Sequence, residues 1–186
     1  MKRVFRYLRG TSDYGLCYQG RLGLDRVLDI HGFVGADWAG DLDHRRSTRG
    51  YVFNLFGGAI SWMIKRQAIV ALSTTEYEYM AATHASKEAV WLQILCSGIG
   101  LVQEAVRIEC DSQSAIFLAK NPAYHSKTKH IDVQYHFVRD MIEEKKVLLM
   151  KINTLKNVAD SLTNVSTEKF SWCRGSMGIA ARIRSK

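Results

Sequence analysis

The stretch from Ser73 to Cys96, STTEYEYMAATHASKEAVWLQILC, constrains the fold of this chain more than any other. It begins with the S-x-x-E pattern of a helix capping box. Small and apolar residues then recur at steps of three and four and share one helical face: Ala82, Ala85, Ala89, Leu92 and Cys96. Because these side chains are mostly small, that face can lie close on a sheet. The pattern predicts one long helix packed against strands.

Glu78 lies on the line of this apolar stripe, four residues before Ala82. A carboxylate on a buried helix face is costly unless it has a partner. Glu76, two residues earlier, can close the capping box and has no such cost. Glu78 is therefore the first candidate functional residue.

Runs rich in β-branched and aromatic residues predict strands on both sides of the helix. Before it, they are YGLCYQG (14–20), VLDIHGFVGA (27–36), the two halves of GYVFNLFGGAISWMI (50–64) and IVAL (69–72). The third run contains Gly57-Gly58, a strong hairpin signal. These runs predict an antiparallel meander.

After the long helix, strands and helices alternate. VRIECD (106–111) and VLLMKIN (147–153) predict strands, and SQSAIFLAKN (112–121), residues 130–146 and NVADSL (157–162) predict helices. The order of elements predicts an α/β fold with a mixed sheet, antiparallel first and parallel later, with helices packed on it.

Four acidic residues lie where these elements begin or end: Asp37, Glu78, Asp111 and Asp160. Three of them also have ordinary structural interpretations. Asp37 suits a turn, Asp111 an N-cap before SQSAI, and Asp160 the start of a helix. Taken together, clustered carboxylates are ligands for Mg²⁺, and a pair of such ions can cleave a phosphodiester.

The composition is that of a folded domain, with 47% hydrophobic residues and one proline among 186 residues. The net charge of +8 lies wholly in residues 1–28 and 166–186, with +4 in each, so charge argues only weakly for a nucleic-acid partner. The four cysteines show no spacing typical of zinc sites or disulfides. No apolar run is long enough to span a bilayer, and the first residues lack a secretory signal, so no membrane association is expected.

Longer stretches resemble a known family. GADWAGDLDHRRSTRGYVFNLFGGAISWMIKRQAIVALSTTEYEYMAA, ECDSQSAIFLAKNPAYHSKTKHIDVQYHFVR and NVADSLTN closely resemble the ribonuclease H domain of Copia-type retrotransposon Pol polyproteins. The resemblance implies a ribonuclease H-like fold with a mixed five-stranded sheet, antiparallel in its first three strands. It also implies three parts: residues 1–28 from the end of the reverse-transcriptase connection, the ribonuclease H-like domain at 29–165, and a basic C-terminal tail at 166–186.

Carried over by position, the resemblance gives three catalytic and metal-binding acids: Glu78, Asp111 and Asp160. The family's first catalytic aspartate opens a D-A-D-W sequence, and Gly35 stands there in G-A-D-W. Asp37 is the candidate substitute, but strand residues two apart are separated by about 6.5 Å, so we expect weakened or abolished turnover. The family's L-T-K-P is also changed, to LTNV at 162–165.

An intact member uses two Mg²⁺ ions to remove RNA from RNA:DNA hybrids, as part of a Pol polyprotein with reverse transcriptase. In the HSKTKHI hallmark, Lys127, Lys129 and His130 are candidate phosphate contacts, although a solvated loop explains them equally well. The resemblance implies a cytoplasmic location, within virus-like particles of an intact element.

Three functions stay open: a ribonuclease H-type hydrolase, a catalytically dead hybrid-binding or inert remnant, and a host-recruited interaction module. Gly35 favours the second, and the three remaining acids favour descent from the first. The aromatic residues Trp38, Trp62, Tyr51 and Tyr77 are expected to pack in the core rather than to stack on bases.

Overall fold

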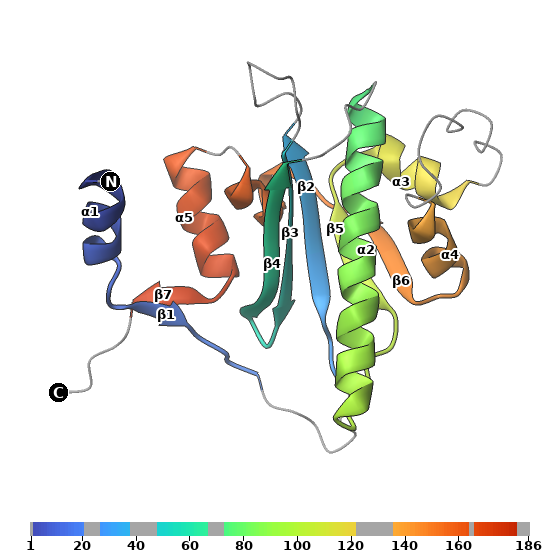
Figure 1. The fold of residues 1–186 in the computed structure, drawn as a ribbon, viewed down its shortest axis with the longest axis horizontal. Coiled ribbons are helices and arrows are strands. Elements are labelled where there is room, and N and C mark those ends of the chain that lie inside the picture. The colour runs from blue at the N-terminus through green and yellow to red at the C-terminus, as the bar shows by residue number, and fades with distance from the viewer. Residues whose placement is uncertain are drawn as a thin grey trace.

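The structure is a computed structural model that describes residues 2–20, 27–37, 48–66, 73–121, 136–163 and 166–181. At its centre is a sheet of five strands: β2 (His31–Asp37), β3 (Thr48–Leu55), β4 (Gly58–Arg66), β5 (Val106–Cys110) and β6 (Val147–Lys151). The strand order is β4-β3-β2-β5-β6 (Figure 1). β2, β3 and β4 pair antiparallel, whereas β5 pairs parallel with both β2 and β6. The predicted mixed sheet is confirmed.

Three helices cover one face of this sheet: α2 (Thr74–Gly98), α3 (Gln113–Lys120) and α4 (Phe137–Glu143). The whole predicted stripe of α2, from Ala82 to Cys96, is buried in the larger hydrophobic core. Ser73 caps the helix, and its Oγ accepts a hydrogen bond from the Glu76 backbone N–H at 3.2 Å. The long helix and its capping residue are therefore as predicted.

The opposite face packs against the C-terminal part of the chain. Two short 3₁₀ helices, η3 (Thr154–Lys156) and η4 (Val158–Leu162), lead to α5 (Thr167–Ser176). A second buried cluster joins the strands to η4, α5 and the residue after α5: Phe33, Val52, Ala59, Val158, Ala159, Cys173 and Met177. Phe33 and Val34 thus serve opposite faces of β2, as strand alternation requires.

The two ends of the chain meet in a small separate ribbon. Helix α1 (Lys2–Gly10), none of whose residues is buried, leads to β1 (Tyr14–Leu16), which pairs antiparallel with β7 (Ile179–Ala181) (Figure 1). Residues 167–181, predicted to belong to a basic tail, form α5 and β7. The division at residues 28 and 165 stays a prediction.

Several boundaries differ from the predictions. The two residues of the hairpin turn are Phe56 and Gly57 rather than Gly57 and Gly58. Phe56 and Gly57 have positive φ angles (53° and 76°), and Gly58 already pairs with Leu55. The helix predicted from residue 130 ends at Glu143, two residues before Lys145, whose φ is 57°. Residues 130–135 and the strand predicted at 69–72 lie outside the described residues.

The prediction of an α-helix at 157–162 was wrong in the type of helix, since the structure has the 3₁₀ helix η4 there. Side chains compete with regular α-helical bonding there: Ser161 Oγ donates to the Val158 carbonyl at 2.8 Å, and Thr163 Oγ1 to the Asp160 carbonyl at 3.1 Å. The tight turn brings the backbone of η4 close to β2 and β3, which positions Asp160.

Two aromatic residues follow the core prediction, since Tyr51 and Tyr77 are buried. Trp62 does not, because 56% of it is exposed, and Trp38 lies outside the described residues. None of the helices in the described part of the chain is both long and apolar enough to cross a bilayer.

Candidate active site

The ends of two parallel strands define the site. Val34 of β2 pairs with Cys110 of β5, so Gly35–Asp37 and Asp111 follow at the same edge of the sheet. Helix α3 begins two residues after Asp111, and Ser112 is its N-cap, since Ser112 Oγ accepts a hydrogen bond from the Ala115 N–H at 3.3 Å. Asp111 is therefore not the capping residue, which removes its main structural alternative.

Glu78 reaches this edge from the first turns of α2. One ligand atom each from Glu78, Cys110 and Asp111 can be chosen so that all three lie within 4.8 Å of one another. Glu78 Oε2 is buried and has no hydrogen-bond partner among the described residues. A buried carboxylate oxygen is normally hydrogen-bonded to another group of the protein. One that has no such donor is typical of a site that binds a cation.

The pKa of Glu78 also shows that the surroundings disfavour its ionised form. Burial, and after it the carboxylates of Asp111 and Asp160, raise the pKa of Glu78 to about 8, while Lys151 acts in the opposite direction. A carboxyl group in this position needs a proton or a cation near neutral pH. The donor set of Glu78 and Asp111 therefore fits a divalent metal with oxygen ligands.

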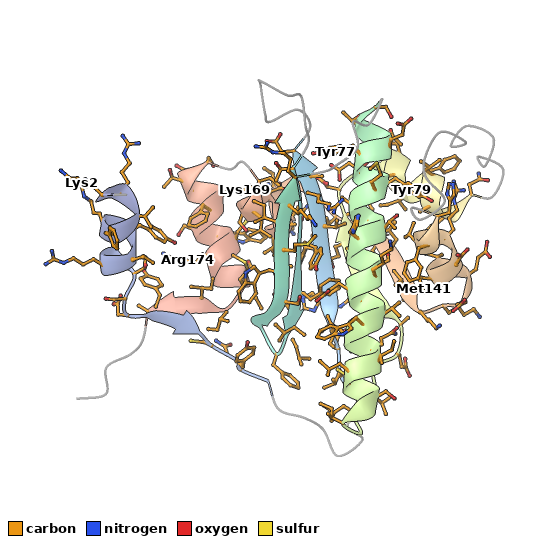
Figure 2. All side chains as sticks on the ribbon, viewed as in Figure 1. Lys2, Tyr77, Tyr79, Met141, Lys169 and Arg174 are labelled. Carbon is orange, nitrogen blue, oxygen red and sulfur yellow. The ribbon has the colours of Figure 1, made fainter. Side chains whose placement is uncertain are left out.

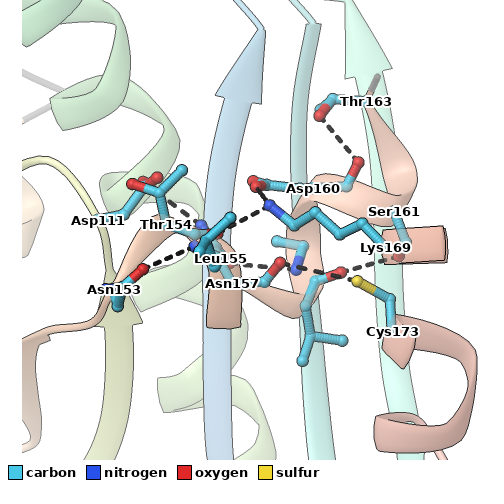
Figure 3. Close-up of polar contacts among 12 residues, drawn as sticks. Asp111, Asn153, Thr154, Leu155, Asn157, Asp160, Ser161, Thr163, Lys169 and Cys173 are labelled. Atoms are coloured by element: carbon cyan, nitrogen blue, oxygen red, sulfur yellow. Dashed lines mark hydrogen bonds and ion pairs between the residues drawn. The ribbon is translucent and has the colours of Figure 1, made fainter. Parts of the chain in front are cut away.

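Asp160 enters the site from the other face of the sheet, on η4. Its Oδ2 accepts a short hydrogen bond from Lys169 Nζ of α5, and the same ammonium donates to the Thr154 carbonyl at 2.7 Å (Figure 3). Burial raises the pKa of the Asp160 carboxyl, while Lys169 lowers it and Asp111 adds a smaller upward effect. Asp160 thus shares the edge with the other acids but already has a cation.

Asn157 connects the two parts of the site. Its side chain is buried, and its Nδ2 donates to the Val34 carbonyl at 2.9 Å and, at 3.4 Å, to Asp111 Oδ1. Its Oδ1 accepts from the Ala159 N–H at 3.1 Å (Figure 3). One amide therefore holds β2, the end of β5 and η4 together.

Gly35 lies directly beneath Asp160. A Cβ built on Gly35 would be 3.0 Å from Asp160 Oδ1 and 3.1 Å from Asn157 Nδ2. A side chain at position 35 would therefore enter the middle of the site. Gly50, its partner on β3, is similarly close to η4, with Leu162 Cβ 3.0 Å from the position of its Cβ. A Cβ at position 35 therefore requires the Asp160 and Asn157 side chains to move by a few tenths of an ångström.

Asp37 follows on the same face of β2 as Gly35, half-buried and paired with Thr48. It does not belong to the group formed by Glu78, Cys110 and Asp111. Its carboxylate nevertheless acts on the buried Tyr77 phenol. Burial first, and then the carboxylates of Glu78, Asp37, Asp111 and Asp160, raise the pKa of Tyr77. All four predicted acids are therefore close enough to act electrostatically on one buried tyrosine.

Asn157 and Lys169 were not predicted from the sequence. Asn157 stands directly before η4, where an asparagine cap is a recognisable signal, whereas no local pattern marks Lys169, nine residues beyond Asp160. Lys127, Lys129 and His130 lie outside the described residues, so their phosphate contacts stay a prediction.

Comparisons of the sequence identify its relatives. A scan against protein-family models matches none. The chain is 48% identical over 180 residues to the retrovirus-related Pol polyprotein from transposon TNT 1-94 of Nicotiana tabacum, covering 96% of this chain and 13% of that protein. It is 38% identical over 164 residues to the corresponding polyprotein from transposon RE2 of Arabidopsis thaliana, covering 88% of this chain and 11% of that protein. The chain thus spans little more than a tenth of these relatives.

Solved structures identify the fold. LC11-RNase H1, isolated from compost by a metagenomic approach, superposes with a TM-score of 0.52 at 17% identity, over 72% of this chain and 91% of its own. The same protein in complex with an RNA/DNA hybrid gives a TM-score of 0.51 at 18% identity, over 76% and 99% of the two chains. The chain is therefore homologous to part of the Copia-type retrotransposon Pol polyproteins, and its central sheet with the flanking helices has a ribonuclease H-like fold.

Proposed function

We propose that this domain descends from a metal-dependent ribonuclease H that hydrolyses the RNA strand of RNA:DNA hybrids, and that Gly35 weakens or abolishes its turnover. The observation that carries the proposal is the convergence of Glu78, Asp111 and Asp160 on one sheet edge, with the missing side chain of Gly35 directed at Asp160. Three of the family's four acids are kept, and the position of the missing one, Gly35, is next to Asp160.

Each residue has a distinct part in such a site. Glu78 and Asp111 would hold one divalent ion, for which Mg²⁺ is the natural choice, and Asp160 would hold a second. When bound, two such ions activate a water and stabilise the leaving oxygen of a phosphodiester. Asn157 keeps Asp111 oriented, and the buried Tyr77 fills the space beneath the carboxylates.

Asp37 is a poor replacement for the missing acid. It lies two residues along β2, about 6.5 Å further on, which exceeds the separation of roughly 3.5 to 4 Å between paired metal ions. A metal held by Asp37 would be drawn away from Asp111 and Asp160. We therefore expect any remaining activity to be low.

The proposed partners follow from the relatives. LC11-RNase H1 binds an RNA/DNA hybrid in its solved complex, and an RNA:DNA hybrid is the substrate we propose here. The homologous Pol polyproteins suggest that the domain once acted beside a reverse transcriptase, in cytoplasmic virus-like particles. Lys127, Lys129 and His130 remain the proposed phosphate contacts.

The decisive experiment compares the parent chain with Gly35→Asp on a labelled RNA:DNA hybrid in Mg²⁺. The revertant should cut faster by about a hundredfold or more, since a metal ligand is worth several kcal/mol and each 1.36 kcal/mol is tenfold in rate. Gly35→Asn is the matched control, because it fills the same space without supplying a charge. Equal cutting by the parent and the revertant would show that Asp37 or another group replaces the ligand.

A second function is favoured by two observations on the same side of the site. Gly35 offers no carboxylate, and Lys169 already neutralises Asp160. Both features suit a catalytically dead module that keeps the fold and binds hybrids without turnover. Hybrid binding by parent and revertant alike, with cutting by neither, would support this alternative.

A further inference from the structure

Lys169 holds Asp160 through a well-defined contact. The lysine lies near the start of α5, and its ammonium donates to Asp160 Oδ2 and to the Thr154 carbonyl (Figures 2 and 3). Both side chains of the ion pair are only 18% exposed. An ammonium with two oxygen acceptors in a largely buried place is an ordered part of the structure, unlike the ion pairs of an open surface.

The C-terminal half of α5 packs against other parts of the chain. Cys173 of α5 is fully buried in the second core cluster. The Arg174 guanidinium lies over the Tyr14 ring, 4.6 Å from its centroid, and β7, directly after α5, pairs with β1. The helix therefore presents Lys169 to Asp160 from a stable base.

An ammonium on Asp160 opposes a metal ion at the same carboxylate. It uses the charge of Asp160 and an oxygen lone pair, and it would repel a divalent cation a few ångströms away. The contrast with Glu78 is direct, because Glu78 Oε2 has no hydrogen-bond partner among the described residues. The protein thus places an ammonium in direct contact with Asp160, whereas Lys151 acts on Glu78 only through its charge.

We propose that Lys169 is a positioning residue that acts as a built-in counter-cation for Asp160. Its ammonium takes the place of a metal ion and must leave before Asp160 can become a ligand, so that metal affinity is set by this competition. The inference rests on the proposed function in so far as it takes this edge to be a metal site.

The test measures Mn²⁺ binding to the full chain from the electron paramagnetic resonance signal of the free ion. Mn²⁺ is a suitable probe because it shares the oxygen ligands of Mg²⁺. The variants are Lys169→Met, which removes the charge, Lys169→Arg, which keeps it, and Lys156→Met as control, an exposed lysine of η3. Each is prepared in the parent and in the Gly35→Asp background.

Lys169→Met should bind Mn²⁺ about tenfold more tightly than the same chain with Lys169. The metal ion then no longer has to displace an ammonium whose hydrogen bond to Asp160 is charge-assisted. Lys169→Arg and Lys156→Met should leave the affinity unchanged. In EDTA, Lys169→Met should also melt about 5 °C lower or more, because Asp160 then stays buried without a partner. A merely structural lysine would lower metal affinity when removed, not raise it.

Two outcomes overturn the inference. One is an unchanged or weaker Mn²⁺ affinity of Lys169→Met in both backgrounds. The other is an absence of Mn²⁺ binding by every variant, Gly35→Asp included, which would also remove the metal site on which the proposed function depends. Tighter Mn²⁺ binding by Lys169→Met without any cutting of hybrids, even with Asp at position 35, would support the counter-cation and contradict only the proposed nuclease.

Discussion

The acidic residues on the two sides of the candidate site differ in whether another group of the protein neutralises them. On the side of α2 and β5, Glu78 and Asp111 lie close together, and Glu78 Oε2 has no hydrogen-bond partner in the described part of the chain. On the side of η4 and α5, Asp160 is paired with Lys169, and the adjoining strand position is glycine. Glu78 bears its burial without a hydrogen-bond partner for Oε2 in the described part of the chain, whereas Lys169 offsets part of the effect of burial on Asp160.

The two acids therefore differ in what they contribute to the stability of the fold and in how readily they can bind a metal. A carboxylate that is left strained weakens the fold, so it is kept only if something outside the chain satisfies it. A carboxylate that receives an internal cation contributes to the fold and gives up part of its capacity to bind metal. Asn157 contacts both sides, through Asp111 and through η4, so the two can be perturbed separately or together.

The largest effect is expected at Glu78. Its pKa is about 8 in the folded chain against an ordinary value of 4.5, so the folded state holds this proton more tightly than the unfolded state. The contribution of Glu78 to stability is therefore fully present below about pH 4.5, declines between about pH 4.5 and 8, and is lost above the folded pKa. The shift corresponds to roughly 5 kcal/mol.

Urea unfolding of the parent and Glu78→Gln in EDTA, from about pH 5 to about pH 9, measures this contribution. The glutamine variant should be of similar stability at the acid end and the more stable of the two at the alkaline end, because it cannot ionise. Two stability curves that stay parallel across this range would mean that Glu78 is not strained, and the contrast between the two sides would disappear.

Asn157→Ala should have the next largest effect, a loss of about 3 kcal/mol in the free energy of unfolding. It leaves the Val34 carbonyl and the Ala159 N–H without their partner and opens a small cavity beneath the site. The matched control is Asn153→Ala, which removes a similar cap from exposed η3, where Asn153 Oδ1 accepts from the Leu155 N–H at 2.9 Å. Denaturant unfolding of both variants measures the difference, and equal losses would contradict the linking role of Asn157.

The sequence predicted the parts of the fold that depend on local pattern. The alanine stripe of α2 and the S-x-x-E cap predicted a helix within two residues of its bounds, and the order of elements predicted a sheet that pairs antiparallel first and parallel later. The 3₁₀ form of η4 was missed because Ser161 and Thr163 bond to the backbone in place of continuing a helix. Such competition depends on side-chain geometry that hydrophobic periodicity does not show.

The candidate site was predictable to the extent that its residues stand at element boundaries. Glu78 on an apolar stripe and Asp111 at a strand end could be found by spacing, and the resemblance to the family pointed to Gly35 and Asp160. Lys169 and Asn157 could not be assigned their roles, since a lysine on an ordinary short helix meets Asp160 only after η4 and α5 pack on the second face of the sheet. The metal-binding roles of the three acids and the positioning roles of Lys169 and Asn157 stay predictions.

The smallest expected effects concern the two serines that cap the helices of the opposing sides. Ser73 Oγ accepts from the Glu76 N–H at 3.2 Å at the start of α2, and Ser166 Oγ accepts from the Lys169 N–H at 3.4 Å at the start of α5. Ser73→Ala should cost about 1 kcal/mol of stability, and Ser166→Ala somewhat less, because its hydrogen bond is longer and more exposed.

The two caps should differ more in metal binding than in stability. Ser166→Ala loosens the turn that carries Lys169, so it should raise Mn²⁺ affinity slightly, about twofold, as a weak form of Lys169→Met. Ser73→Ala loosens the turn that carries Glu78 and should lower that affinity. The free Mn²⁺ signal measures both. If the two substitutions changed metal affinity in the same direction, the two sides of the site could not have opposite roles, whatever the cost of each cap to the fold.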